Sequence, residues 1–301
     1  MMKHAVPSKK IIRLEKKMLA KKGTIIQNEN CDSTSKMRVI AISSGKGGVG
    51  KTNIVANLGF SLSQLGKKVF ILDADLGLGN LDILLGMTPK YNLSHVVAGL
   101  KTIAEITVEG PGKMNILPAS SGIQELTQLG EEHKTKLLKE IDVLKDFIDI
   151  LLIDTAAGIS SNVLYFNAAA QDIMVVVAHE PASITDAYAL MKVLSLQYST
   201  NHFKLLVNLA ANKEEAYEVY RQLNLVADRF LDITIEYIGY VLFDENVTKS
   251  VRRQKVVSEL YPNSQASKCF VSIANKICES PPHFPQGDTS FFWKHLLQKK
   301  S

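Results

Sequence analysis

The stretch GKGGVGKT, residues 45–52, lies between a short apolar run and a segment with helical periodicity. It fits the phosphate-loop pattern G-x-x-x-x-G-K-[ST] at every defined position and in the required strand–loop–helix setting. Glycines there let backbone N–H groups turn inward around phosphate oxygens, beside a helix N-terminus. Lys51 is predicted to reach the β- and γ-phosphates and Thr52 to ligate Mg²⁺. The bland alternative is a glycine-rich turn that binds nothing, which the Lys, the Thr and the setting disfavour.

Around this loop the sequence alternates short apolar runs with amphipathic stretches, which predicts βαβ units and a doubly wound α/β fold with a mostly parallel sheet. The apolar runs show little alternation, as in strands covered on both faces. Strands are predicted at 39–43, 68–72, 114–117, 148–153, 173–178, 204–207 and 233–239. Helices are predicted at 53–65, 131–142, 183–197, 213–229, 246–253 and 265–278.

Carboxylates end two of the predicted strands. Asp73 and Asp75 follow the second strand, and Asp154 ends the strand ILLID, three residues before Ala157 and four before Gly158. The carboxyl ends of parallel strands are where open α/β sheets bind ligands. We therefore expect Asp154 to hold Mg²⁺ with Thr52, although Asp154 alone would also suit a helix N-cap. Of Asp73 and Asp75, one would organise the waters of Mg²⁺ and the other would orient the attacking water. Gly158 is predicted to offer its N–H to the γ-phosphate, so that hydrolysis releases the loop.

An adenine pocket is predicted from two later strand ends. Asn208 ends the strand KLLVN, and its amide can pair with both the donor and the acceptor of adenine. Phe243, after the last strand, is a candidate for the other wall, with a plain core position as its alternative. Asn208 without further support would equally suit a turn cap.

Lys46, directly after the first glycine, makes KGGVGKT a deviant Walker A loop. With it the sequence resembles the MinD/ParA superfamily of dimerising P-loop ATPases, the SIMIBI type, over roughly residues 37–278. The resemblance implies that Lys46 reaches the partner subunit's ATP across a homodimer and that Asn208 contacts the base. It also implies that Asp75 activates water, with Asp73 on the magnesium side. It implies slow hydrolysis of ATP to ADP and phosphate with Mg²⁺. The predicted nucleotide contacts are Gly45, Lys46, Gly47, Gly48, Val49, Gly50, Lys51, Thr52, Asn53, Gly158, Asn208 and Phe243, and the catalytic residues are Lys46, Lys51 and Asp75.

Within that superfamily the sequence is most similar to the flagellar number and placement regulators, the FlhG (FleN) branch. The similar stretches are residues 74–82 (ADLGLGNLD), 157–160 (AGIS), 179–190 (HEPASITDAYAL) and 244–264. The resemblance implies a flagellar GTPase of the FlhF type, a flagellar transcription activator or a basal-body protein as partner. The activation motif D-Q-A…L-R of that branch is absent from the N-terminal segment, so stimulation of such a GTPase by this segment is not expected.

The charge divides the chain of 301 residues into a body and a basic N-terminal segment. The net charge is +5, and residues 1–36 hold nine Lys/Arg against three Asp/Glu. We expect a flexible tail at 1–36, an ATPase domain at 37–279 and a Pro-rich linker at 280–289. In residues 290–301, Phe291, Phe292, Trp293, Leu296 and Leu297 share one helical face flanked by lysines, which predicts an amphipathic membrane-targeting helix. The alternative is a helix that docks on the protein's own body.

No apolar run approaches the roughly 18 residues that span a bilayer, and no secretory signal is visible. We expect a cytoplasmic protein that binds the inner membrane surface peripherally in its ATP state, at the cell pole in a flagellar role.

An iron–sulfur relative would need paired thiolates after the second and third motifs. The cysteines lie elsewhere, at Cys31, Cys269 and Cys278. A division-site MinD, a DNA-partitioning ParA and a non-catalytic anti-activator remain as alternatives, with DNA the least expected partner.

Overall fold

The computed structural model describes residues 37–77, 79–119, 130–142 and 144–281. They form an eight-stranded sheet in the order β3-β4-β2-β5-β1-β6-β7-β8. Every neighbouring pair is parallel except β3 with β4. The strands are β1 (Arg38–Ser44), β2 (Val69–Ala74), β3 (Val108–Glu109), β4 (Asn115–Leu117), β5 (Ile150–Ala157), β6 (Asp172–Ala178), β7 (His202–Ala210) and β8 (Thr234–Leu242). The predicted α/β fold with a mostly parallel sheet is confirmed.

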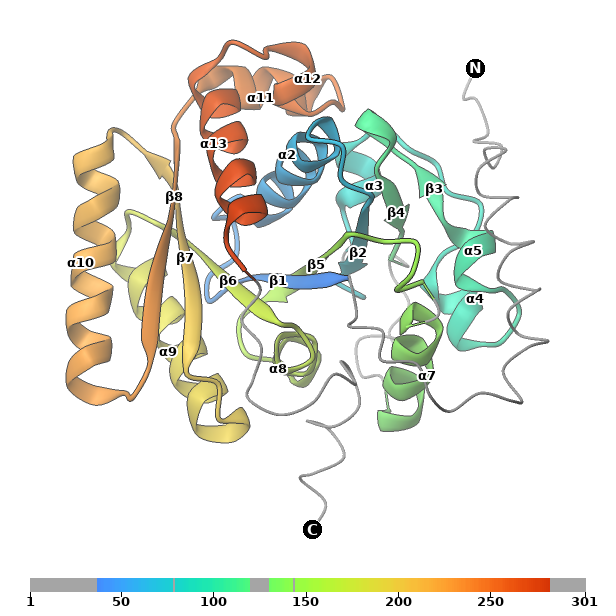
Figure 1. Ribbon diagram of the computed structural model, residues 1–301, viewed down its shortest axis with the longest axis horizontal. Helices are drawn as coiled ribbons and strands as arrows, with labels where there is room; N and C mark the ends of the chain where they lie inside the picture. The colour runs from blue at the N-terminus through green and yellow to red at the C-terminus, as the bar shows by residue number, and fades with distance from the viewer. Residues whose placement is uncertain (1–36, 78, 120–129, 143, 282–301) are drawn as a thin grey trace.

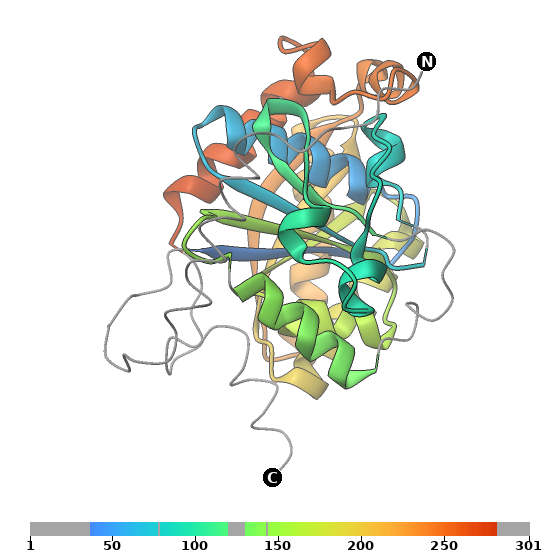
Figure 2. The same cartoon turned by 90° about the vertical axis from the view of Figure 1, so that its right-hand side faces the viewer.

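Helices cover both faces of the sheet, because side chains of each buried strand alternate between two apolar layers (Figures 1 and 2). In β1, Ile40 and Ile42 face one layer while Val39 and Ala41 face the other. The first layer packs under α2 (Lys51–Gln64), α12 (Val257–Leu260) and α13 (Gln265–Glu279). The second face is covered by α7 (Glu131–Asp142), α8 (Ser161–Ala168), α9 (Pro181–Tyr198) and α10 (Lys213–Phe230).

All seven predicted strands and six predicted helices are found, with boundaries that differ by a few residues. The elements missing from the prediction are short or weakly patterned: β3, α3 (Leu81–Leu84), α4 (Leu93–Val97), α5 (Ile103–Ile106), the 3₁₀ turn η1 (Pro111–Lys113), α8 and α12. α11 (Glu245–Arg252) agrees closely with the predicted helix 246–253. The predicted tail 1–36 and the membrane-targeting helix 290–301 lie outside the described residues.

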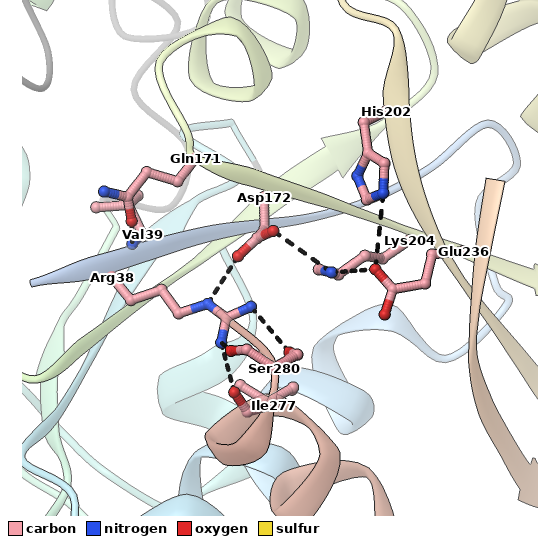
Figure 3. A network of polar contacts seen from close by, with 9 residues as sticks. All are labelled: Arg38, Val39, Gln171, Asp172, His202, Lys204, Glu236, Ile277 and Ser280. Atoms are coloured by element: carbon pink, nitrogen blue, oxygen red, sulfur yellow. Dashed lines mark hydrogen bonds and ion pairs between the residues drawn. The ribbon is translucent and has the colours of Figure 1, made fainter. Parts of the chain in front are cut away.

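A chain of buried charges joins the amino ends of the strands to the end of α13 (Figure 3). Arg38 Nε lies 2.7 Å from Asp172 Oδ2, and its guanidinium also donates to the carbonyls of Ile277 and Ser280. Lys204 lies 3.6 Å from the other oxygen of Asp172 and pairs with Glu236 on β8. Buried charges are tolerated when they are paired and hydrogen-bonded in this way. The chain fixes the C-terminal end of α13 against β1 and β6, at the end of the sheet opposite the phosphate loop.

No helix in the described ranges is long and apolar enough to cross a membrane.

Candidate functional site

The loop between β1 and α2 is an open turn of backbone with glycine where the geometry needs it. Gly48 and Gly50 have φ of 83° and 84°, in the left-handed region that disfavours side chains. A Cβ on Gly47 or Gly48 would meet nothing within 4 Å, so the space in front of this part of the loop is clear. The loop therefore presents its backbone to an unobstructed volume at the N-terminus of α2, the arrangement that cradles phosphate oxygens.

Gly45 is required for a different reason, which is a close approach between two backbones. A Cβ at this position would lie 2.1 Å from the carbonyl carbon of Asp186 and 2.6 Å from the nitrogen of Ala187. Asp186 and Ala187 belong to the second turn of α9, so the first residue of the loop packs directly on that helix. Any side chain here would push the loop away from α9.

Lys51 and Asp154 form a buried ion pair at the start of α2. Lys51 Nζ lies 2.5 Å from Asp154 Oδ1, and the Thr52 hydroxyl also hydrogen-bonds the Asp154 carboxylate. Burial raises the pKa of Asp154, and the Lys51 ammonium and the Thr52 hydroxyl act in the opposite direction. The predicted phosphate-binding lysine and the two predicted metal-side groups are therefore brought together.

Asp73 faces Asp154 across the β2–β5 pair, where the two residues are register partners. Its oxygens accept from the N–H groups of Asp75 (3.2 Å) and Leu81 (3.3 Å). Burial and the neighbouring Asp154 carboxylate raise the pKa of Asp73 from 3.8 to about 8. With that pKa Asp73 holds its proton at neutral pH beside Asp154, and a bound divalent cation would favour its ionised form instead.

Asp75 stands half-buried just beyond the end of β2. Its negative charge acts on the pKa values of both Asp73 and Asp154, so all three carboxylates belong to one electrostatic group. It is less buried than the other two, which leaves it access to solvent. Its role in orienting water stays a prediction.

Lys46 points out of the loop toward the end of β6. Its ammonium forms an ion pair with Glu180, and both side chains are solvent-exposed. The Ser44 hydroxyl donates to the Lys46 carbonyl (2.9 Å), which fixes the backbone from which the lysine projects. An exposed pair of this kind contributes little stability, so Lys46 can exchange Glu180 for another anion at small cost.

Gly158 lies where β5 leaves the sheet, with φ of 88° and no atom within 4 Å of its would-be Cβ. Its N–H donates to the carbonyl of Ser44, 2.9 Å away. A contact between this N–H and a γ-phosphate requires that bond to break. In the predicted switch Gly158 would therefore exchange one hydrogen-bond partner for another, and the first of them is Ser44, the residue that precedes the phosphate loop.

Asn208 is buried at the end of β7, and its amide donates to the carbonyl of Val49 at 2.8 Å. A Cβ on Gly50 would lie 2.5 Å from that same amide nitrogen. Asn208 therefore supports the phosphate loop directly, a role that the sequence interpretation did not include.

Phe243 follows β8 and is 62% exposed, which rules out the alternative of a core position and leaves its ring free for a ligand.

The donor set suits a nucleotide with a hard cation. A hydroxyl and carboxylates are ligands that Mg²⁺ prefers, and the open loop backbone suits phosphates. In the parts of the chain that the structure describes, no cluster of three or more His, Cys, Asp or Glu residues forms a metal site of its own.

Comparisons with known proteins decide the family. The AAA domain family matches residues 37–207. Antiactivator FleN of Pseudomonas aeruginosa is 43% identical over 263 residues, which are 87% of this chain and 94% of that protein. The chain belongs to the MinD/ParA family of P-loop ATPases. Its resemblance to the FleN branch is confirmed by this match and by flagellum site-determining protein YlxH of Helicobacter pylori, 32% identical over 89% of this chain and 92% of that protein.

Solved structures of the MinD/ParA family share the fold. MinD cell division protein of Aquifex aeolicus superposes with a TM-score of 0.65 at 26% identity, covering 83% of this chain and all of that one (100%). As a member of this family, the chain is a P-loop ATPase.

Two contacts of the phosphate loop were not predicted from the sequence. Glu180, the partner of Lys46, and the Asp186–Ala187 backbone under Gly45 both fall in the stretch 179–190 that carried the flagellar resemblance. The signal was present, because that stretch begins at the carboxyl end of β6 beside the loop.

Proposed function

We propose that this chain is an ATP-driven switch that limits the number of flagella and sets their position. The observation that supports it most is the 43% identity with antiactivator FleN, together with a phosphate loop that carries both lysines. ATP would join two copies into a dimer, and slow hydrolysis to ADP and phosphate would separate them.

The residues divide the chemistry by position. The backbone of residues 45–50 and Lys51 hold the phosphates, while Thr52 and Asp154, with Asp73 behind them, hold the cation. Bound Mg²⁺ supplies charge neutralisation for the phosphates. Asp75 orients the attacking water, and the site contributes mainly positioning and electrostatic stabilisation. Asn53, at the first turn of α2, and Phe243 complete the nucleotide contacts, with Asn208 holding the loop beside the base.

Lys46 is the residue that would make the site depend on a second copy. It lies on the outer side of the loop and is held there by Glu180, an exposed partner on the same chain. In the dimer it would leave Glu180 for the partner subunit's phosphates, a stronger anion. Gly158 would exchange Ser44 for the γ-phosphate in the same state, which is a local change of hydrogen-bond partner that distinguishes ATP from ADP.

The output of the switch is proposed from the relatives and the C-terminal sequence. In the ATP state the dimer would sit peripherally on the cytoplasmic membrane, at the cell pole, through the predicted helix at 290–301. There it would act on a flagellar transcription activator, a basal-body protein or a GTPase of the FlhF type. A two-turn anchor is weak alone, so two of them in a dimer would couple ATP to membrane residence.

Counting flagella tests the biological role. In the source bacterium, deletion of the gene should raise the number of flagella per cell in electron micrographs. A copy encoding the native chain should restore the count, and a Lys51→Ala copy should not. A deletion that leaves flagella normal but produces minicells would support the division-site MinD alternative, and loss of plasmids or chromosomes would support a ParA role; either result would overturn the proposal.

A further inference from the structure

A groove of about 400 Å³ follows the outer edge of β8, on a surface that the nucleotide site does not use. β8 is the last strand in the sheet, and Figure 1 shows it with α10 on one side and α13 on the other. Residues of all three elements line the groove, from Tyr237 to Leu242 along the strand. At about 3.3 Å per residue this length of strand extends for about 17 Å.

The floor of the groove is apolar and contains an unsatisfied hydroxyl. Ile238 and Ile273 are buried beneath it, and Gly239 lets the strand approach α13 so closely that a Cβ would lie 3.3 Å from Ile273 Cγ1. The Tyr237 hydroxyl is buried and has no hydrogen-bond partner in the described part of the chain.

The rim of the groove is basic. Lys213 begins α10, while Lys268 and Lys276 lie on α13, eight residues and about 12 Å apart along the helix. Among the described residues, none of the three lysines has an ion-pair partner within 4 Å. The nearby carboxylate of Asp244 is already engaged by the N–H groups of Asn246 and Ala266.

The strand itself offers hydrogen bonds on this side. β8 pairs with β7 along one edge, and no further described strand covers the other. At the carboxyl end, the Leu242 backbone hydrogen-bonds the half-buried Cys269 thiol, and both residues line the groove. An exposed strand edge is a template for an added strand, since backbone bonds give affinity and flanking pockets give selectivity.

We propose that this groove binds an acidic segment of a partner protein in extended conformation, added as a strand to the edge of β8. The apolar floor takes apolar side chains of the segment, and the three lysines of the rim select its carboxylates. Charge argues against the chain's own ends as occupants: residues 1–36 carry nine Lys/Arg against three Asp/Glu, and 282–301 carry three against one. The site is thus a surface for a partner beyond the nucleotide switch, and it needs no dimer.

Binding of a defined peptide to the full chain tests this inference. The probe is a fluorescent peptide of about ten residues with Glu at alternate positions and Val or Thr between them. Its controls are the same peptide with Lys in place of Glu, and the Glu peptide with alternate backbone nitrogens methylated. Peptide binding is measured for the Lys46→Ala chain as well as for the native chain. Because Lys46→Ala should prevent dimerisation, this comparison separates peptide binding in the groove from the proposed dimer switch. Fluorescence anisotropy should show binding of the Glu peptide by both chains and at least about tenfold weaker binding of both control peptides.

Charge reversal locates the site. Lys268→Glu with Lys276→Glu should weaken the Glu peptide at least about tenfold, whereas Lys67→Glu with Lys192→Glu, an equal change of charge at exposed positions outside the groove, should not. In a Cys31→Ser, Cys278→Ser chain the peptide should also slow the reaction of Cys269 with a maleimide.

Four results would overturn the proposal. The first two are equal binding of the Glu and Lys peptides and equal losses in the two double variants. The third is at least about tenfold stronger peptide binding after removal of residues 1–36 or 282–301, which would mean that the chain's own end fills the groove. The fourth is protection of Cys269 by ATP-dependent dimerisation without any peptide, which would assign the groove to a second copy.

Discussion

Lys51 Nζ lies 2.5 Å from Asp154 Oδ1, so the phosphate-binding lysine and the metal-side carboxylate are direct partners. Both side chains are buried, and the Thr52 hydroxyl shares the same carboxylate. The pair keeps two charges of the site compensated inside the protein. A bound phosphate would pair with Lys51 and a bound cation with Asp154, so the site would favour a phosphate and a cation that bind together.

Asp154→Asn tests that arrangement. The amide keeps the size of the side chain and a hydrogen-bond acceptor but loses the charge that attracts the cation. We expect the native chain to bind a fluorescent ADP analogue more tightly with Mg²⁺ than with EDTA, and the variant to lose most of that difference. A variant that keeps the full effect of Mg²⁺ would show that Asp154 has no part in holding the cation.

Asp75→Ala should separate hydrolysis from dimerisation. The phosphates and the cation keep their predicted ligands in this variant, while the attacking water loses its orienting carboxylate. Phosphate release should fall by at least about tenfold, and the dimer should persist with ATP. A phosphate-release assay follows the first quantity, and light scattering over the same reaction follows the second. A monomeric variant that hydrolyses ATP at the native rate would remove Asp75 from the mechanism.

Much of this site was predictable because its residues sit in local patterns. The loop 45–52 and the strand-ending Asp73 and Asp154 follow from the order of strand, turn and helix, since parallel strands bring their carboxyl ends to one edge. The deviant lysine Lys46 needed the family resemblance for its role.

The contacts that were not predicted depend on positions far apart in the sequence. Asn208 supports Val49 from 159 residues away, and Lys46 meets Glu180 from 134 residues away. No periodicity contains such a pairing, because it is created by the sheet order that places β6 next to β1 and β7 next to β6. The short helices α3, α4 and α5 were missed for a related reason: each has too few turns to show a period, and caps rather than patterns define α4 and α5.

Asp244 should make the junction of α11 and α13 sensitive to acid. Its carboxylate accepts from the N–H groups of Asn246 (2.9 Å) and Ala266 (3.1 Å), and these bonds outweigh burial and hold its pKa below 3.8. A lowered pKa in the folded state stabilises the protein above pH 3.8, and that contribution disappears as the pH falls through the folded value.

The Asp244→Ala variant measures this contribution. At neutral pH it should unfold with about 1 kcal/mol less free energy than the native chain, as for loss of an N-cap, and the difference should shrink at acid pH. Urea denaturation at several pH values gives both quantities. A difference that is the same at every pH would exclude the charge of Asp244 as its cause. Lys249→Ala, which removes only an exposed ion pair with Glu245, serves as the control with little expected effect.

Trp293 reports on the predicted membrane helix, since it is the only tryptophan of the chain. Anionic vesicles with Mg²⁺ and ATP should shift its emission to the blue, and ADP should give a smaller shift, because two weak anchors act together only in the dimer. Neutral vesicles are the control. An emission already blue in buffer and unchanged by lipid would mean that this segment packs on the protein body.

The mass of the particle with each nucleotide tests the central claim most directly. Multi-angle light scattering of the native chain should give 33.2 kDa with Mg²⁺ and ADP and twice that mass with Mg²⁺ and ATP. Lys46→Ala should stay at 33.2 kDa with either nucleotide while still binding ADP like the native chain, whereas Lys51→Ala should lose ADP binding itself. A Lys46→Ala chain that dimerises normally with ATP, or that loses ADP binding as fully as Lys51→Ala does, would contradict the assignment of Lys46 to the partner's nucleotide and with it the proposed switch.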